Sequence, residues 1–356
     1  MGWLRNCWYM AGWTDELAIG ARLARTIIDV PLLFWRDQDG RVRAIVDRCA
    51  HRLVPLSMGQ IERDIVRCGY HGLAFDGNSG RCIHNPHGPI SSALAVRVYP
   101  LVERHKILWV WMGEADAADD SAIPDLSFVD ETPQHAFSAG YMPTAADHRL
   151  LEDNILDLSH GDYLHAATLG GGSFTRADVR VEERGSNVFV QWSAKREKAI
   201  PIWQPELPDP DMLVDTVTEV LWYPSGVMLL DSVLKASDGP GDFAIITHNA
   251  HIMTPETATS THYFYCNARN YRVDDAEYNA AITAGLAAAF GGEDKPMIEA
   301  QQRRIGDSDL LDCQPALMSI DNASTRARRI YRRLVVAQGV GEGTRPLPDQ
   351  ARAQAG

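Results

Sequence analysis

The sequence predicts an α+β protein in which a β-rich N-terminal domain precedes a domain that mixes helices and strands. No helical period of apolar residues occurs before residue 115, whereas short apolar runs bounded by turn residues repeat there. An acidic, alanine-rich stretch at 114–120 then marks a boundary. Beyond this boundary, helical periods flank a strand-like region at 175–270.

At 356 residues the chain is long enough for two domains, each with its own core. We expect the first domain over residues 1–115 and the second over residues 116–340. Residues 341–356 are rich in Gly, Pro and Gln, and we expect them to form a disordered tail.

The N-terminal half reads as a series of strands and turns. Asp37–Gly40 is a turn signal that predicts a hairpin between Leu32–Arg36 and Val42–Asp47. A second turn is expected at Asp76–Gly80. The further strands that we predict are 3–13, 25–30, Ala95–Leu101 and Lys106–Met112.

The C-terminal half begins with a helix over 148–160. Its Asn154, Asp157 and His160 have the spacing i, i+3, i+6, which predicts that they share one helix face. Strand-like alternation follows to about residue 270. Three further segments are predicted to be helical: Asp274–Phe290, which Gly291-Gly292 should break, Glu293–Ile305, and Asn322–Ala337 with a local basic face of five arginines.

The composition excludes several classes of protein. The formal charge of −13 argues against nucleic acid as the main partner, because phosphate binding needs a basic surface. No apolar run approaches the ~20 residues that a membrane span requires, and the N-terminus lacks the apolar core of a signal peptide. Four of the six cysteines, Cys7, Cys82, Cys266 and Cys313, have no disulfide spacing, so we expect them to be reduced thiols and the protein to be cytoplasmic.

Two short loops carry the most specific motif. Arg48–Arg52 reads R-C-A-H-R and Cys68–Gly72 reads C-G-Y-H-G. Two thiolates and two imidazoles are the ligand set of a Rieske [2Fe–2S] centre, in which two His replace two Cys on one iron. A Cys2His2 zinc site would use the same atoms, although C-x-H spacing is unusual for zinc. Core cysteines beside unrelated surface histidines are the third interpretation.

Together with the neighbouring Arg52, Pro55, Leu56, Gly59, Tyr70, Gly72, Phe75 and Asp76, this motif resembles the Rieske non-haem iron oxygenases. The resemblance spans nearly the whole chain. It implies that Cys49, His51, Cys68 and His71 hold the cluster in an all-β Rieske domain. It also implies that the second domain is a helix-grip (START-like) catalytic domain with an antiparallel sheet and a mononuclear non-haem Fe(II).

A second metal site is predicted around His160 and His165. A cluster that moves single electrons needs a second centre that uses them. A 2-His-1-carboxylate triad provides such a centre, because it leaves iron positions open for O2 and for substrate or water. On a regular helix a spacing of five residues turns two imidazoles apart, so we expect a π-bulge or a helix end near Gly161. Taken alone, two histidines near a helix end are more often structural, but beside the cluster motif we interpret them as ligands.

Asn154, Asp157, His160 and His165 also match the family's D-N-x-x-D-x-x-H-x-x-x-x-H signature. The resemblance implies catalytic roles for Asn154 and Asp157, and a bridge from Asp157 to His71 of the partner subunit in a head-to-tail homotrimer. We expect the Asp157 carboxylate to accept the second ring N–H of His160; a plain salt bridge is the alternative for Asp157.

The third iron ligand must come from far downstream. The family carries it in an E-D-K-P-type segment, which this chain has as Glu293-Asp294-Lys295-Pro296. We assign Asp294 as the ligand, with Glu293 as the alternative.

The opening R-N-C-W-Y and H-I-M-T-P-E-T at 251–257 resemble the branch that includes the vanillate and dicamba O-demethylases. This resemblance implies that His251 contacts the substrate; a structural strand histidine is the alternative. We also assign Asp231 to the substrate pocket. An inward Asp231 would favour a neutral or amine-bearing substrate, and an outward one would leave the substrate class open.

The function implied is the terminal oxygenase of a Rieske monooxygenase that uses O2 to oxidise a small aromatic compound, with O-demethylation as the main expectation. N-demethylation, methyl hydroxylation and ring dihydroxylation are alternatives for the same site. A Rieske electron carrier and a structural zinc protein are alternatives of other classes. No G-x-G-x-x-G follows a strand, so we expect a separate NAD(P)H-dependent reductase or ferredoxin to supply electrons.

Overall fold

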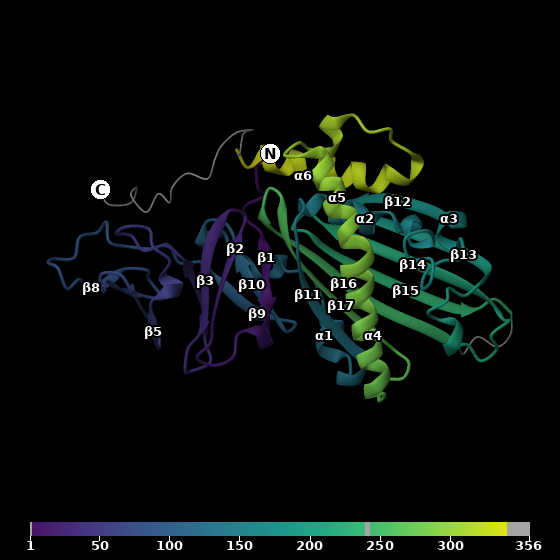
Figure 1. Cartoon of the computed structure of the whole chain (residues 1–356), viewed down its shortest axis with the longest axis horizontal. Coiled ribbons are helices and arrows are strands. Elements are labelled where there is room, and N and C mark those ends of the chain that lie inside the picture. The colour runs from purple at the N-terminus through teal and green to yellow at the C-terminus, as the bar shows by residue number, and fades with distance from the viewer. Residues whose placement is uncertain (1, 239–242, 340–356) are drawn as a thin grey trace. The chain divides into compact units, whose positions relative to one another are not determined.

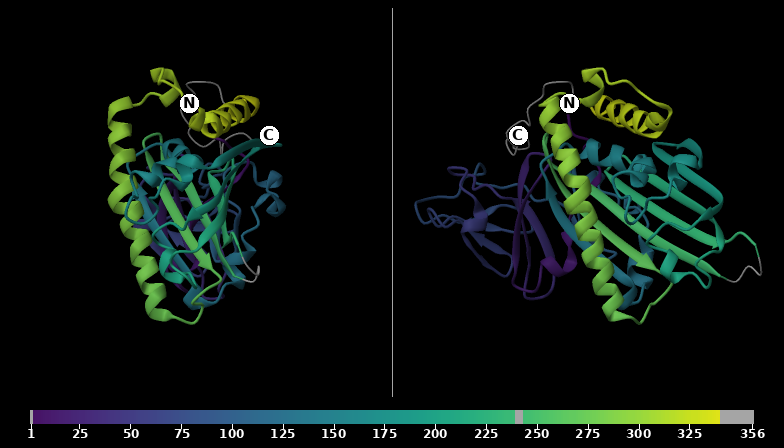
Figure 2. Two further views of the ribbon diagram at one scale, coloured as in Figure 1. Left: turned by 90° about the vertical axis from the view of Figure 1, so that its right-hand side faces the viewer. Right: turned by 45° about the vertical axis from the view of Figure 1, so that its right-hand side comes forward.

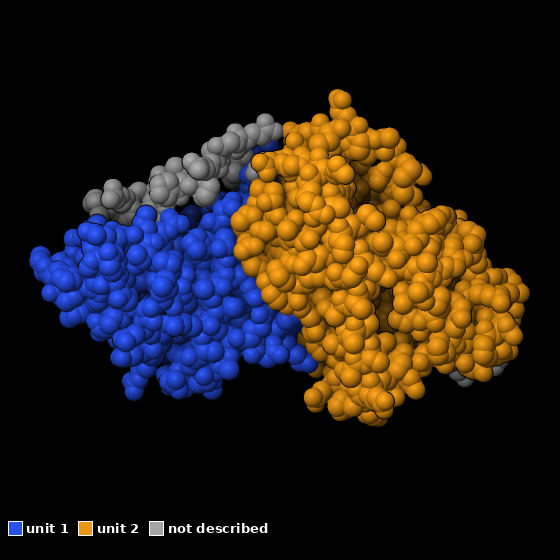
Figure 3. All heavy atoms as spheres, viewed as in Figure 1, with its two compact units in different colours: residues 1–125, 335–356 blue, residues 126–334 orange. Residues whose placement is uncertain are grey.

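The computed structural model describes residues 2–238 and 243–339. The chain divides into two compact units, residues 1–125 with 335–356 and residues 126–334 (Figure 3). The predicted domain boundary at residue 115 lies in the acidic stretch before this division. The predicted tail, 341–356, lies outside the described residues.

The first unit contains short strands in three antiparallel sheets, ordered β1-β10-β9, β2-β3-β4 and β5-β6-β7-β8. Its strands are β1 (Trp8–Trp13), β2 (Arg22–Ile27), β3 (Val30–Arg36), β4 (Val42–Val46), β5 (Gln60–Glu62), β6 (Ile65–Arg67), β7 (Ala74–Asp76), β8 (Cys82–His84), β9 (Leu101–Arg104) and β10 (Ile107–Trp111). Its other elements are the single 3-10 turns η1 (Thr14–Glu16), η2 (Leu56–Met58), η3 (Ala115–Ala117) and η4 (Asp120–Ala122). The predicted β character of this part of the chain is confirmed.

The predicted hairpin across Asp37–Gly40 is also confirmed, because β3 and β4 pair antiparallel from Arg36↔Val42 to Leu32↔Val46. The predicted strand at 95–101 is different. Val96 N–H donates to Gly80 while Tyr99 N–H donates to Ala44, so this stretch alternates between two sheets and forms only isolated bridges. The regular strand β9 therefore begins only at Leu101.

The second unit is organised around one seven-stranded antiparallel sheet, ordered β11-β17-β16-β15-β14-β13-β12. Its strands are β11 (Phe137–Thr144), β12 (Asp178–Arg184), β13 (Asn187–Lys198), β14 (Leu213–Tyr223), β15 (Val227–Ala236), β16 (Ala244–Thr257) and β17 (Ser260–Arg269). Strands β12 and β13 form a tight hairpin through Gly185-Ser186.

Helices lie against this sheet. They are α1 (Ser127–Glu131), α2 (His148–Leu156), α3 (Ser173–Arg176), α4 (Ala276–Ala289), α5 (Lys295–Ile305) and α6 (Asn322–Ala337), with 3-10 turns η5 (Gln134–Ala136), η6 (Leu158–Asp162), η7 (Gln204–Glu206), η9 (Leu310–Cys313) and η10 (Ser319–Asp321). Figures 1 and 2 show α4 and α5 running as one rod along one face of the sheet, which is the arrangement of the predicted helix-grip domain. None of the described helices is long and apolar enough to cross a membrane.

Gly291 and Gly292 do not break this rod, contrary to our prediction. Phe290–Asp294 forms η8, a π-helical turn whose flanking residues keep right-handed helical dihedrals. Because α4 and α5 continue one another through η8, tertiary packing overrides the low helix propensity of the two glycines. This π turn was not predicted; the π-bulge that we had considered near Gly161 is absent, because a helix end and the 3-10 turn η6 stand there instead.

Candidate iron and cluster sites

Three side chains converge in the second unit: His160 from η6, His165 just beyond it, and Asp294 from the end of η8. One ligand atom of each lies within 4.8 Å of the others. Nε2 of His165 lies 3.1 Å, and Nε2 of His160 3.6 Å, from Oδ1 of Asp294. Among the described residues, no other three His, Cys, Asp or Glu side chains come this close.

The two histidines meet because helix α2 stops before them. Its last residue is Leu156, and Asp157 has extended dihedrals (φ −132°, ψ 94°). The Asp157 carboxylate caps the next turn by accepting the Ser159 N–H at 3.0 Å. The predicted helix end is thus confirmed, but it lies before Asp157, so the prediction that Asn154, Asp157 and His160 share one helix face was wrong.

Each imidazole has a partner on the nitrogen that points away from the convergence point. Nδ1 of His165 donates to Oε2 of Glu293 at 2.5 Å. Nδ1 of His160 donates to the backbone carbonyl of Asp157, also at 2.5 Å, and not to the Asp157 carboxylate as predicted, because that carboxylate is turned to the Ser159 N–H. Both contacts fix the tautomer that leaves Nε2 for a metal ion.

The π-helical turn η8 lets two consecutive carboxylates reach one ring. Successive side chains on an α-helix are about 100° apart, yet Glu293 contacts Nδ1 and Asp294 contacts Nε2 of the same His165. Asn154 donates from Nδ2 to Oδ1 of Asp294 at 3.2 Å and so helps to orient this carboxylate. The geometry favours Asp294 as the ligand and gives Glu293 the supporting position.

The electrostatics of this group suit a divalent cation. Burial lowers the pKa of His165, but its hydrogen bonds to Asp294 and Glu293 outweigh burial and raise it. The side chain of Asp294 is only 5% exposed, so its charge requires a counter-charge nearby. Two imidazoles and one carboxylate form the triad of a non-haem Fe(II) site with open positions, and His160, His165 and Asp294 fit this centre.

The pairing register shows which sheet residues lie on the side of the iron site. Residues directly opposite one another in neighbouring strands share a face, and successive residues alternate. His251 lies opposite Met228 and Tyr265, whereas Asp231 lies opposite His248. His248 and His251 are three residues apart in β16, so they occupy opposite faces. The structure therefore places Asp231 on the face away from His251, where it pairs with His248 at 2.8 Å.

His251 stands in an aromatic wall next to the iron ligands. Its Nδ1 contacts the Tyr263 hydroxyl at 2.7 Å, and the edge of Phe290 approaches the rings of both His251 and Tyr265. Burial lowers the pKa of His251 to about 4, so the ring is neutral near pH 7. We had not predicted Tyr263, Tyr265 or Phe290; the alternation of Y-F-Y in β17 carries the signal for the two tyrosines.

Buried ion pairs hold α2 behind this site. Arg328 of α6 contacts Asp153 at 2.5 Å, and Arg149 pairs with Asp147 at the helix start. The Arg328 side chain is only 6% exposed. Arg328, which we had placed on a basic helix face, is therefore buried and pairs with an acidic neighbour on α2.

In the first unit, the two cluster loops have the same backbone pattern. The N–H of Cys49 donates to the carbonyl of Val54, and the N–H of Cys68 donates to that of Leu73, both five residues ahead. The residue four positions after each cysteine, Leu53 or Gly72, donates back to the cysteine carbonyl and has positive φ (59° and 75°). Leu53 holds a conformation that disfavours a side chain, which indicates a backbone shaped by the loop's task.

The ligand side chains of these loops suit a two-iron cluster. Cys49 and Cys68 are buried, whereas the His51 and His71 rings lie 4.6 Å apart toward the loop tips. Within the described part of the chain, no three of these four groups bring their ligand atoms close enough for one ion. A single zinc would need that convergence, so the donor set and its spacing fit the [2Fe–2S] centre.

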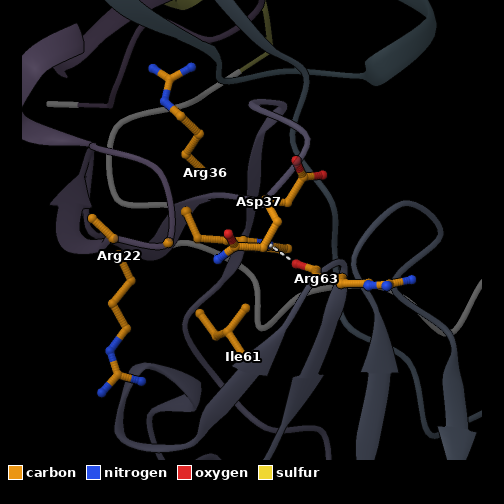
Figure 4. Close-up of a pocket in the computed structure, with 9 residues that line it drawn as sticks. Arg22, Arg36, Asp37, Ile61 and Arg63 are labelled. Atoms are coloured by element: carbon orange, nitrogen blue, oxygen red, sulfur yellow. Dashed lines mark hydrogen bonds between the residues drawn. The ribbon is translucent and has the colours of Figure 1, made fainter.

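The first unit also has a hollow of about 320 Å³ away from these four ligands, lined by Arg22, Arg36, Asp37, Ile61 and Arg63 among others (Figure 4). Figure 4 shows the Arg22 and Arg36 side chains pointing in different directions. Arg36 pairs with Glu103, and Asp37 pairs with Arg43. The hollow therefore offers no convergent set of charges.

Comparisons with known proteins agree with both sites. Residues 7–100 match the Rieske [2Fe-2S] domain, and residues 144–337 match the vanillate O-demethylase oxygenase C-terminal domain. The chain is 36% identical to the oxygenase component of chloroacetanilide N-alkylformylase from Rhizorhabdus wittichii, over 94% of this chain and 97% of that protein. It is 35% identical to the oxygenase component of dicamba O-demethylase from Stenotrophomonas maltophilia, over 94% and 98%.

The fold also matches the crystal structure of dicamba monooxygenase bound to 3,6-dichlorosalicylic acid, with a TM-score of 0.86 and 33% identity over 96% of this chain and all of that chain. The predicted cofactors are confirmed as a Rieske [2Fe–2S] domain and a mononuclear non-haem iron site. The chain belongs to the Rieske non-haem iron oxygenases, as an oxygenase component of the vanillate and dicamba O-demethylase type.

Proposed function

We propose that this oxygenase removes a methyl group from a heteroatom on an aromatic ring, with O-demethylation as its main reaction. The observation that carries the proposal is the His160, His165 and Asp294 triad beside an aromatic wall of His251, Tyr265 and Phe290. In the balanced reaction, a methoxyarene, O2, two electrons and two protons give the phenol, formaldehyde and water. The cluster, when bound, supplies single electrons, and the iron supplies the position at which O2 is used.

The chain's own residues bind and orient. Asn154 holds the Asp294 carboxylate, and Glu293 holds the His165 ring, so both ligands keep a fixed direction. His251 and Tyr263 present a neutral hydrogen-bonded pair on the sheet face. The Phe290 ring packs against this pair and against Tyr265, which excludes water from that side of the site.

We further propose that a separate NAD(P)H-dependent reductase or ferredoxin delivers the electrons, and that the active form is a head-to-tail homotrimer in the cytoplasm. In this arrangement Asp157 would connect the iron site to His71 of the partner subunit. The exposed position of His51 at the loop tip supports electron entry and exit there. The four cysteines outside the cluster motif, Cys7, Cys82, Cys266 and Cys313, are free thiols and support the cytoplasmic location.

N-dealkylation is the second candidate for the same site. The relative that acts as a chloroacetanilide N-alkylformylase is 36% identical to this chain, as similar as the dicamba O-demethylase. Methyl hydroxylation and ring dihydroxylation are the lower-ranked candidate reactions for this site. A pure electron carrier would leave the second unit and its triad without a role.

Oxygen uptake by the purified oxygenase with a reductase tests the proposal. Methoxy-, methylamino- and methyl-substituted aromatics are compared, and formaldehyde is measured together with the ring product. We expect substrate-dependent uptake with one formaldehyde per O2 for methoxyarenes. A cis-diol without formaldehyde would replace demethylation by ring dihydroxylation, and formaldehyde from methylamino compounds alone would replace it by N-dealkylation.

A further inference from the structure

A pair of asparagines lies on the sheet face that carries His251. Asn249 of β16 is directly opposite Asn267 of β17, and Nδ2 of Asn267 donates to Oδ1 of Asn249 at 2.7 Å. Asn249 precedes His251 by two positions and Asn267 follows Tyr265 by two positions, which is about 7 Å along each strand. The pair is thus the next row of side chains on this face beyond the aromatic wall.

This row is less buried than its neighbours on the same face. Thr247, His251 and Tyr265 on the same face are buried. Asn249 and Asn267 remain partly exposed, although both belong to strands inside the sheet. A side chain in the interior of a sheet stays partly exposed only where other side chains do not cover it completely, so the two amides are accessible from this face.

The hydrogen bonds fix the direction of both amides. Nδ2 of Asn249 donates to the backbone carbonyl of Leu230 at 3.0 Å, so its Oδ1 must be the acceptor from Asn267. Oδ1 of Asn267 and one N–H on each amide have no partner within the described residues. The row therefore presents an acceptor and donors side by side, which complements a ligand that also carries both.

In strands β14 to β17, no exposed cation lies on the face of this row. Arg269 is the only arginine or lysine on this face in strands β14 to β17. It is 4% exposed, and its Nη groups already donate to Asn279 and to the carbonyls of His135 and Arg272. The Nε of Arg269 has no hydrogen-bond partner in the described residues, but it is buried and so is not presented to a ligand. A carboxylate on the substrate would therefore lose its hydration here without a direct ion pair, which is costly in a buried site.

We infer that this oxygenase takes a neutral aromatic substrate that carries an amide or a similar paired donor and acceptor, and that Asn249 and Asn267 bind this group. The inference rests on the proposed function, because it places the reacting alkyl group at the iron and the aromatic ring between the iron and the two asparagines. Asn249 and Asn267 act as specificity-determining residues that touch the substrate. Leu230, next to them, supplies an apolar contact for the ring.

Binding to the resting, iron-loaded holoenzyme tests the inference without turnover. The three methoxybenzamide isomers are compared with the matching methoxybenzoates by calorimetry. We expect at least one amide to bind about tenfold more tightly than its acid, and Asn249→Leu or Asn267→Leu to reduce amide affinity about tenfold while leaving the acids unchanged. His248→Asn changes the opposite face of the same strands and serves as the control.

Cluster absorbance and iron content report whether each variant folds, and Asn249→Ser and Asn267→Ser replace any leucine variant that does not. Acids that bind as tightly as the amides, or asparagine variants that keep the preference for amides, would overturn the inference. Amide binding without formaldehyde formation would instead remove the proposed demethylation and leave the assignment of this binding row intact.

Discussion

Replacing Glu293 tests how the iron site is held. Glu293 accepts from Nδ1 of His165 at 2.5 Å, and its side chain is 42% exposed. A hydrogen bond to a charged group contributes about 1.5–3 kcal/mol, and solvent weakens it. We therefore take about 1.4 kcal/mol, which equals about tenfold in an equilibrium constant, and expect Glu293→Ala to weaken iron binding about tenfold. Glu293→Gln keeps an acceptor and should lose less.

The assay separates the two metal centres of one chain. Acid-labile sulfide counts the cluster, and iron in excess of sulfide counts the mononuclear site, whose affinity follows from titration with a competing chelator. The acid-labile sulfide content of every variant should equal that of the parent protein. Asp294→Ala should leave no iron in excess of sulfide, because it removes a ligand. Glu277→Ala, on the exposed face of α4, is the control.

Two outcomes would refute this reasoning. Iron affinity in Glu293→Ala equal to that of the Glu277→Ala control would mean that the His165 partner contributes nothing. Retention of iron by Asp294→Ala, with loss in Glu293→Ala, would make Glu293 the ligand and Asp294 its support.

Two further predictions concern residues behind the iron. Asp157→Ala and Asp157→Asn should both keep the two metal centres and nearly stop turnover. Only Asp157→Ala should lose the cap on η6, which contributes about 1 kcal/mol to stability. Normal product formation by a pre-reduced variant in a single turnover would contradict the proposed electron route. Burial raises the pKa of Glu152 to about 8, so the folded chain loses stability as pH rises from the ordinary Glu range toward that value. Glu152→Gln should therefore raise Tm over the parent more at about pH 8.5 than at about pH 5.5, and a pH-independent difference would contradict this.

The Glu152 comparison isolates one group. Glu152 lies inside the unit, where its Oε2 accepts from Nε1 of Trp222 at 2.9 Å. A glutamine can accept the same hydrogen bond without a charge, so packing is kept while the titration is removed. Ionisable groups far from Glu152 are common to both proteins and cancel in the difference, whereas His148 and Asp153 are close enough to couple to its charge.

The metal ligands could be predicted from the sequence because their motifs are local. The four cluster ligands lie in two loops of similar spacing, and the two histidines lie within six residues of one another. The carboxylate was harder, since Glu293 and Asp294 are adjacent and only the shape of η8 decides which one faces the metal. The shape of η8 depends on packing in the folded unit, and local helix propensity does not predict it.

The substrate side could not be predicted in the same way. The segment V-M-L-L-D-S-V-L around Asp231 has apolar residues on both faces, because helices cover one side of the sheet and side chains such as Phe128 lie near the other. Without clean alternation, the face of Asp231 depends on the register, and a shift of one residue reverses it. The register puts Asp231 opposite His248 and puts Asn249 on the face of His251 instead.

The iron site forms where two helices depart from regular α geometry. In a regular helix, His160 and His165 would point about 140° apart, and Glu293 and Asp294 about 100° apart. The end of α2 at Leu156 removes the first constraint, and the π turn in η8 removes the second. The site uses both departures: at the end of α2 the Asp157 carbonyl orients His160 and the Asp157 carboxylate caps the turn that carries it, and at η8 both carboxylates reach His165. The cost of these two departures from α-helical geometry is therefore offset by contacts that also orient the ligands, and a sequence that favoured regular α-helices at both places would lose the convergence of the ligands.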